Sequence, residues 1–204
     1  MNYLDVYHDM LNIYGPQNWW PSDSVLETLI GAILVQNTNW LNAEKSLQNL
    51  RSATNFEPQL LAKLDSAEIK ELIIPSGFYH AKSETIHAAL QYFNRFNVNS
   101  KVVSTTIPTR DLRNELLKIK GIGNETADVI LLYIFQRPVF IADAYSKKMI
   151  SFFENRDSKK LKYLQVKTEM EAQLTELTTS DFQEFHALID EHIIDYLTIQ
   201  KEKS

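Results

Sequence analysis

Two glycines that lie two residues apart between helical patterns offer a site for a phosphate group. The segment KGIGNETA, residues 120–127, contains two of the five glycines of the chain. Glycine tolerates positive φ and lets a partner approach the backbone closely. The N–H groups at the start of the second helix carry the positive end of the helix dipole, which suits an anion without much side-chain charge. The alternative is an ordinary turn between two helices, in which glycine ends the first helix.

Asp143 stands between the apolar run 139–142 and the start of another helical pattern. A carboxylate at this place can stabilise a developing positive charge and can orient or deprotonate a water molecule. Aspartate is also a common N-cap, which is the alternative interpretation. Both roles need the same position, so the residue types alone leave the choice open.

Aromatic and amide side chains gather early in the chain, where all three tryptophans lie within 22 residues. Aromatic clusters usually belong to a core. Here two tryptophans and a proline lie in a loop, and side-chain amides are costly to bury without partners. Aromatic faces beside amides suit a pocket for a planar base. The candidate pocket residues are Trp19, Trp20, Pro21, Gln36, Asn37 and Trp40.

Two histidines and a turn are weaker candidates. His186 and His192 are six residues apart, so they do not share a helical face and make a poor pair of metal ligands. We interpret both as structural or solvated histidines. Residues 76–79, Ser-Gly-Phe-Tyr, form either a capped turn or the wall of a pocket.

The elements that must position these residues are helices. Apolar residues recur at three- and four-residue spacing, and the 5 glycines and 6 prolines are too few for many hairpins. Ser24 with Glu27 fits a capping box, and Thr38 or Asn39 can cap the following helix. Residues 139–142 suggest a short extended segment. The pattern predicts helices over about residues 3–14, 25–37, 40–50, 60–64, 68–74, 78–96, 109–118, 127–134, 161–177 and 182–200, with one more from residue 143.

The composition excludes several classes of protein. The net charge is −5 and the pI about 5.6, so nucleic-acid binding must depend on a local patch. With no cysteine, the chain has no disulfide, no thiolate zinc site and no cysteine-ligated iron–sulfur cluster. No apolar run reaches the roughly 18 residues of a membrane span. The first segment, MNYLDVYHDM, has acids where a signal peptide needs basic residues, so we expect a cytoplasmic protein.

Taken together, these segments resemble the helix–hairpin–helix DNA glycosylases of the endonuclease III type. The matching pieces are residues 31–38, 75–79, 120–127 and 141–143, within a stretch of roughly residues 19–150. The Trp-Trp-Pro loop, the Gln-Asn-Thr turn and the Asp-x-Tyr-Ser sequence are most similar to the 3-methyladenine DNA glycosylase III subfamily. The resemblance implies an all-α fold of two helical domains with a DNA-binding cleft. A six-helix block over residues 24–134 would hold the hairpin, and residues 1–23 with 135–204 would form the other domain.

The resemblance also assigns roles. It makes Asp143 the essential aspartate at the mouth of the cleft and Trp40 the best candidate for stacking on the base. Other pocket residues would be Trp19, Trp20, Pro21, Gln36 and Asn37. Phosphate binding is expected from Lys120, Gly121, Gly123, Glu125, Thr126 and Lys147.

Two departures from the family pattern matter. Bifunctional members carry a lysine, which forms a Schiff base with the sugar, where this chain has Glu125. Without that amine there is no β-elimination by that route, so the resemblance implies a monofunctional enzyme without AP lyase activity. Many endonuclease III relatives hold an iron–sulfur cluster, which a chain without cysteine cannot bind. We therefore expect no cofactor and no metal.

The implied reaction is hydrolysis of the N-glycosidic bond of alkylated purines such as 3-methyladenine, as a step of base excision repair. The expected partner is double-stranded DNA that contains damaged bases, with no membrane contact and with the protein acting as a monomer. The alternatives are a glycosylase of other base specificity and a non-enzymatic helix–hairpin–helix DNA-binding protein. A third is a helical protein with no nucleic-acid role, which the negative net charge favours.

Overall fold

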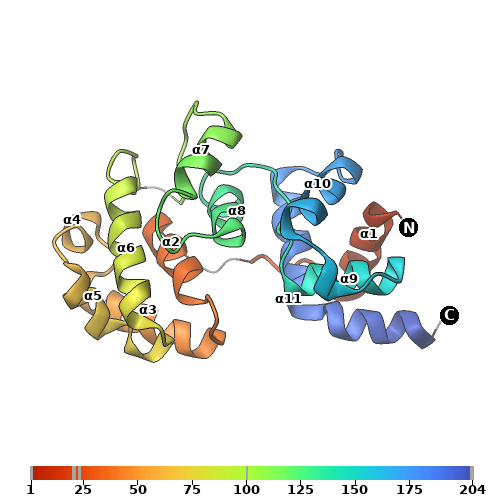
Figure 1. Cartoon of the computed structure of the whole chain (residues 1–204), viewed down its shortest axis with the longest axis horizontal. Coiled ribbons are helices and arrows are strands. Elements are labelled where there is room, and N and C mark those ends of the chain that lie inside the picture. The colour runs from red at the N-terminus through yellow and green to blue at the C-terminus, as the bar shows by residue number, and fades with distance from the viewer. Residues whose placement is uncertain (1, 20–21, 23, 100, 203–204) are drawn as a thin grey trace. The chain divides into compact units, whose positions relative to one another are not determined.

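The computed structural model describes residues 2–19, 22, 24–99 and 101–202, and over these residues it contains helices and no strand (Figure 1). The expected all-α fold is therefore confirmed. The chain divides into two compact units. We call Ser22–Gln136 the hairpin unit, and Met1–Pro21 together with Arg137–Ser204 the terminal unit. Among the described helices, none is long and apolar enough to cross a membrane.

The hairpin unit is built around one fully buried helix, α2, which spans Val25–Leu34. Every residue of α2 is buried, because apolar side chains occupy nearly all of its faces. It packs against α3, α6 and α8. The other elements of this unit are α3 (Trp40–Thr54), α4 (Pro58–Leu61), α5 (Ser66–Leu72), η1 (Ile74–Ser76), α6 (Tyr79–Phe93), α7 (Thr109–Leu116) and α8 (Asn124–Tyr133).

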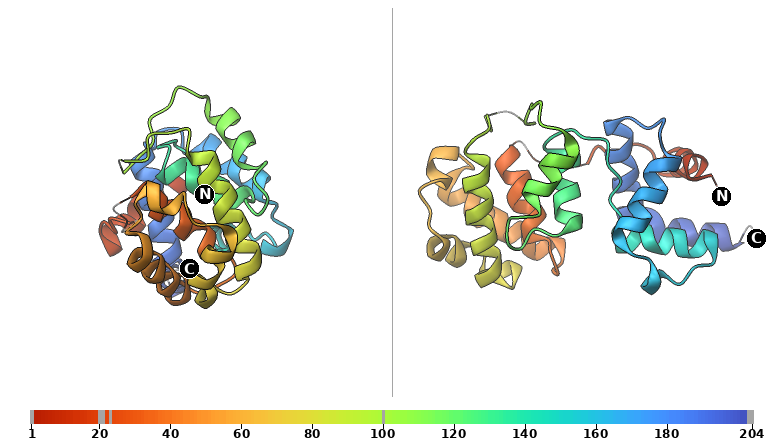
Figure 2. Two further views of the ribbon diagram at one scale, coloured as in Figure 1. Left: turned by 90° about the vertical axis from the view of Figure 1, so that its left-hand side faces the viewer. Right: turned by 45° about the horizontal axis from the view of Figure 1, so that its top comes forward.

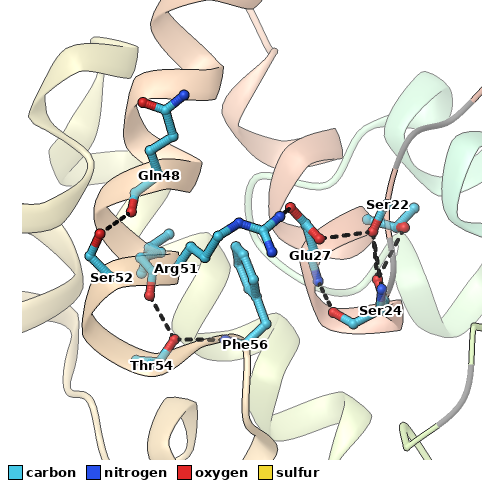
Figure 3. A network of polar contacts seen from close by, with 10 residues as sticks. Ser22, Ser24, Glu27, Gln48, Arg51, Ser52, Thr54 and Phe56 are labelled. Carbon is cyan, nitrogen blue, oxygen red and sulfur yellow. Dashed lines mark hydrogen bonds and ion pairs between the residues drawn. The ribbon is translucent and has the colours of Figure 1, made fainter.

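The start of α2 differs from the predicted capping box, as Figure 3 shows. Ser24 caps the helix, since its side chain accepts from the Glu27 N–H at 3.0 Å. The Glu27 carboxylate does not return to the Ser24 backbone; it accepts from Ser22 Oγ at 3.3 Å and pairs with Arg51. Glu27 is buried, so a cationic partner offsets the cost of desolvating its charge. Only half of the capping box forms.

The terminal unit joins the two ends of the chain, and its long helix α11 packs against α9 and α1 (Figure 2). Three tyrosine hydroxyls of α1 donate to carboxylates on these neighbours: Tyr3 to Glu154, Tyr7 to Asp181 and Tyr14 to Asp195. The elements are α1 (Tyr3–Tyr14), α9 (Ala144–Glu154), η2 (Ser158–Lys160), α10 (Tyr163–Gln173) and α11 (Thr179–Glu202).

The apolar run 139–142 is buried, but it forms no strand. The Phe140 N–H donates to the Glu171 carboxylate of α10 at 2.9 Å, so a side chain takes the place of a neighbouring strand. This buried segment leads directly to Asp143 at the start of α9.

Candidate functional site

The glycine turn joins α7 to α8, and its two glycines have different tasks. Gly121 has φ +94°, a conformation that side chains disfavour. A Cβ on Gly121 would lie 2.0 Å from Oγ1 of Thr85, which donates to the Lys120 carbonyl at 3.0 Å. Gly121 therefore allows α6 to approach the turn closely. Gly123 has φ −92° and open space around it; it is the N-cap of α8 and provides no side-chain cap. The N-terminus of α8 thus begins without a capping side chain.

An ion pair with a buried carboxylate holds the two hairpin helices together. The Arg113 guanidinium of α7 donates to both carboxylate oxygens of Asp128 on α8, at 2.9 and 3.1 Å. It also donates to Asn124 Oδ1, at the first residue of α8, at 2.8 Å. Asp128 is fully buried, so breaking this pair would leave an uncompensated charge inside the unit. These hydrogen bonds fix the position of the first turn of α8 relative to α7.

Gln36, a predicted pocket residue, is tied to the hairpin. Its Nε2 donates to Thr126 Oγ1 at 2.8 Å and to the Gly121 carbonyl at 3.3 Å. These two hydrogen bonds offset the cost of taking the amide out of water. Thr126, a predicted phosphate ligand, is buried. Asn37 is exposed and has φ +53°. Trp40 is the first residue of α3 and 39% exposed, and Asn39 rather than Thr38 caps that helix by accepting from the Asn42 N–H.

Lys82 on α6 is a buried charged group that the sequence did not single out. Its Nζ donates to the Leu34 carbonyl at 2.7 Å and to the Ser76 carbonyl at 2.8 Å. Burial lowers the pKa of this amine to about 8. Through these two bonds Lys82 joins the end of α2, which leads to Gln36, to the turn that leads to Phe78.

Phe78 is the most conspicuous apolar side chain on the surface of the hairpin unit. It is 70% exposed and has φ +48°, a strained conformation for a bulky residue. The predicted helix start at residue 78 is shifted by one, because Phe78 is the N-cap of α6 and the helix begins at Tyr79. An exposed aromatic ring on strained backbone, beside a turn held by a buried lysine, is a feature that needs a functional explanation.

The predicted phosphate lysines lie in different units. Lys120 belongs to the hairpin unit, where its exposed Nζ lies 3.3 Å from a Glu84 carboxylate oxygen. Exposed pairs of this kind contribute little stability and exchange readily for another anion. Lys147 is on α9 of the terminal unit, over the ring of Tyr163. Glu125, at the second residue of α8, is exposed.

Asp143 is the N-cap of α9, as one of the two interpretations of the sequence predicts. Its Oδ1 accepts from the Ser146 N–H at 2.7 Å, and Ser146 Oγ donates to the Asp143 carbonyl at 3.1 Å. The residue is buried, at 7% exposure. The start of a helix is a favourable place for a negative charge. The hydrogen bond from Ser146 occupies one oxygen of the carboxylate and fixes its direction.

His186 and Trp19 lie side by side in the terminal unit, which also contains Asp143. The Trp19 ring is 5.4 Å from the imidazole of His186, centroid to centroid. Burial lowers the pKa of His186, and the charge of the Asp143 carboxylate opposes that effect. Trp20 and Pro21, the neighbours of Trp19 in the predicted pocket, lie outside the described residues.

His192 has a structural role, as the sequence predicts. Its ring stacks on Tyr14 at 4.3 Å and hydrogen-bonds Gln17 Oε1 at 2.9 Å. Over the residues that the structure describes, no group of three His, Asp or Glu side chains is placed to hold a metal ion.

Comparisons with a family model and with known proteins all match DNA repair proteins. A family model described as "HhH-GPD superfamily base excision DNA repair protein" matches residues 30–189. The chain is 38% identical over 188 residues to the "Putative DNA repair glycosylase MJ1434" of Methanocaldococcus jannaschii, which covers 92% of this chain and 84% of that protein. It is 32% identical over 130 residues to Endonuclease III of Thermotoga maritima, which covers 64% of this chain and 56% of that protein.

Two solved structures share the fold. The Helicobacter pylori 3-methyladenine DNA glycosylase MagIII, bound to 1,N6-ethenoadenine, has a TM-score of 0.78 at 24% identity and covers 96% of this chain and 99% of that chain. A non-covalent Endonuclease III–DNA complex has a TM-score of 0.70 at 16% identity and covers 92% of this chain and 82% of that chain. At these identities the similarity extends to the fold.

Proposed function

Because the chain belongs to the HhH-GPD superfamily of base excision DNA repair proteins, we propose that it is a monofunctional DNA glycosylase for alkylated purines such as 3-methyladenine. The observation that carries this proposal is Asp143, a buried carboxylate aimed by the Ser146 N–H at the start of α9. A protein that only binds phosphates has no need of such a group. The fold shared with a 3-methyladenine glycosylase supports the choice of base.

The hairpin unit would hold the DNA backbone. The start of α8 presents N–H groups to a phosphate, with no side chain on Gly123 to block the approach. Lys120 would exchange its exposed partner Glu84 for a phosphate oxygen. These contacts fix the position of the protein on the duplex without reading its sequence.

Phe78 would support extrusion of the damaged nucleotide. Taking a nucleotide out of the stack costs a few kcal/mol. Apolar side chains that enter a base step offset such a cost by filling the space between bases. Phe78 is suited to this because its ring is exposed before DNA arrives and its turn is held in place by Lys82 and Ser76.

The chemical step is hydrolysis at C1′ of the extruded nucleotide. The bond from C1′ to the purine nitrogen breaks, its electron pair leaves with the base, and a water oxygen forms the new bond to C1′. Asp143, when ionised, would stabilise the positive charge that develops on the sugar and would take or direct the proton that the water loses. The released products are the free base and an abasic site.

If the base to be released is a cation, one carboxylate is enough for the reaction. N3-alkylated adenine already carries a positive charge, which departure of the base neutralises, so no strong general acid is needed. An electron-rich indole favours such a cation by about 0.5–2 kcal/mol. Trp40, exposed at the start of α3, and Trp19, beside His186 in the terminal unit, are the described tryptophans that we assign to this task.

We expect no lyase activity because two candidate positions lack an amine that could attack the sugar. Glu125 carries a carboxylate where bifunctional relatives carry a lysine, and a carboxylate cannot form an imine. Lys82 is 4% exposed, and its Nζ already donates to two carbonyl groups, so it is not placed to attack a sugar.

The test is release of free base from methylated duplex DNA, followed by borohydride treatment of the reaction. We expect free 3-methyladenine and no trapped protein–DNA adduct. A trapped adduct would contradict the monofunctional assignment, and binding of duplex without base release would support a non-enzymatic binding protein. Because the chain is also 32% identical to an Endonuclease III, the assay includes duplexes with oxidised pyrimidines and mismatches; preferential release from those would support the other specificity.

A further inference from the structure

Lys82 joins two turns that lead to residues of the proposed mechanism. Its side chain is buried, and its Nζ donates to two carbonyl groups that end helices. One belongs to Leu34, the last residue of α2, at 2.7 Å, and the other to Ser76, the last residue of η1, at 2.8 Å. Carbonyls at the end of a helix have no partner within it and carry the negative end of its dipole, so they suit an ammonium group. One side chain therefore fixes the distance between the end of α2 and the turn before α6.

The ammonium group is costly to keep in this place. Over the described residues, no carboxylate pairs with Lys82, and burial lowers the pKa of its amine to about 8. A methionine of similar length would fill the space without a buried charge, but it has no N–H group to donate to the carbonyls. What the lysine adds over an apolar side chain is therefore the position of the two turns.

Both turns contain backbone that needs to be held. Asn37, in the turn after α2, has φ +53°, and Phe78, in the turn after η1, has φ +48°. Neither residue is glycine, so each conformation costs free energy that the surrounding contacts must offset. Lys82 also holds the second turn through its backbone, because its N–H donates to the Phe78 carbonyl at 3.0 Å. The exposed ring of Phe78 is thus presented by a turn that Lys82 binds on both sides.

Helix α6 connects this turn to the glycine turn of the hairpin. Thr85 lies on α6 about one helical turn after Lys82, and its Oγ1 donates to the Lys120 carbonyl at 3.0 Å. A Cβ on Gly121 would collide with that hydroxyl, so the helix and the hairpin are in close contact. At a rise of about 1.5 Å per residue, Phe78 and Thr85 lie about 10 Å apart along the helix. The ring of Phe78 therefore stands at a short and fixed distance from the proposed phosphate site.

We propose that Lys82 is a positioning residue for extrusion of the nucleotide: by binding the carbonyls of Leu34 and Ser76, it holds the ring of Phe78 at a fixed distance from the phosphate that the hairpin binds. This inference rests on the proposed function. A side chain that enters the stack must reach one particular base step, and the point at which the backbone is held decides which step it reaches. Without the two hydrogen bonds the hairpin would still bind DNA, but Phe78 would enter the stack less often.

The first experiment tests whether Lys82 holds both turns, and it needs no activity. Amide hydrogen exchange is compared between the wild-type protein and Lys82→Met. We expect faster exchange in residues 35–38 and 76–78, because both segments lose a bond that limits local opening. Unchanged exchange in these two segments would overturn the proposal. If circular dichroism shows that Lys82→Met is unfolded, Lys82→Gln, whose side chain is one atom shorter and uncharged, takes its place.

His87→Leu is the matched control for this comparison. His87 is also on α6, and its Nδ1 lies 3.3 Å from the carbonyl of Leu64, in a different loop. The variant therefore removes a contact of the same kind from the same helix. We expect it to change exchange in residues 62–65 and to leave the two turns that Lys82 binds as they are in the wild type.

The second experiment measures affinity and single-turnover release of an alkylated purine from two duplexes. In one duplex the base is paired, and in the other it lies in a single-nucleotide bulge, where extrusion costs less. For Lys82→Met we expect affinity within about twofold of the wild type and release about three- to fivefold slower from the paired duplex, with little change from the bulge. Lys82→Arg keeps a charge and N–H donors and should recover most of the rate. His87→Leu should release base as the wild type does.

The double variant Lys82→Met, Phe78→Ala shows whether Lys82 acts through Phe78. If it does, the double variant releases base no more slowly than Phe78→Ala alone. Losses that multiply, or an equal loss on the paired and bulged duplexes, would contradict the proposal and leave Lys82 as a residue of the fold only. A wild-type protein that releases no alkylated base from either duplex would instead contradict the proposed function and, with it, the role of Lys82 in extrusion.

Discussion

The two units hold their functional groups in opposite ways. In the hairpin unit the proposed ligand groups are backbone N–H groups at the start of α8, and the ion pair of Arg113 with the buried Asp128 holds that helix against α7. In the terminal unit the proposed functional group is a side chain, Asp143, and a backbone N–H holds it. Substitutions should therefore separate binding from chemistry: changes to the hairpin should weaken DNA binding, and changes at Asp143 should slow base release.

The largest effect is expected from Asp143→Asn. Asparagine caps helices as well as aspartate does, so α9 should keep its start and the protein its fold. Loss of the charge removes stabilisation of the developing sugar cation, and the rate of base release should fall by about 100- to 1,000-fold. Single-turnover kinetics on an alkylated duplex measure this, with thermal unfolding as the control. A near-normal rate would mean that Asp143 is a plain cap.

Gly121→Ala should have the next largest effect, on DNA binding. The new Cβ would lie 2.0 Å from Thr85 Oγ1, and alanine disfavours the positive φ of this position, so the hairpin must move. We expect a loss of stability of about 1–3 kcal/mol and at least a tenfold weaker affinity for duplex.

The double variant Thr85→Ala, Gly121→Ala is the matched control for this change, because it removes the hydroxyl that causes the closest contact. It should recover part of both losses, since the strain of positive φ remains. If the single variant binds DNA as the wild type does, the hairpin is an ordinary turn and the phosphate site lies elsewhere.

Phe78→Ala should have the smallest of these effects. The ring is exposed, so removing it should leave the melting temperature nearly unchanged. Base release should slow by about three- to tenfold, because the extruded state loses a group that fills the stack. Leu164→Ala, an exposed apolar residue on α10 of the terminal unit, serves as the control and should change neither quantity. Equal rates for Phe78→Ala and the wild type would remove Phe78 from the proposed mechanism.

How much the sequence predicts depends on whether a feature is local. The helix starts at Ser24 and Asp143, and the glycine turn, depend on neighbouring residues, and the structure confirms them. Four contacts depend on residues far apart in the chain, and periodicity carries no information about them. These are Lys82 with Leu34, Arg113 with Asp128, Gln36 with Thr126, and His186 with Trp19.

Glu27 shows how packing overrides a local motif. Its spacing from Ser24 fits a capping box, yet its carboxylate turns to Arg51 because the side chain is buried and needs a cation. In the sequence Lys82 cannot be told apart from a surface lysine. Only the fold shows that it is buried and donates to two carbonyl groups. The Ser-Gly-Phe-Tyr turn at residues 76–79 was the one sequence feature that pointed to Phe78, which the structure places at positive φ.

The division of binding and chemistry between the two units is tested by comparing Asp143→Asn with Gly121→Ala on one alkylated duplex, with affinity and single-turnover base release determined for both. We expect opposite results: Asp143→Asn keeps its dissociation constant within a few-fold and loses base release, whereas Gly121→Ala loses affinity and keeps most of its release rate at saturating protein. If Asp143→Asn instead releases base at a near-normal rate, or if both variants fail in the same way, the division of binding and chemistry between these residues is wrong.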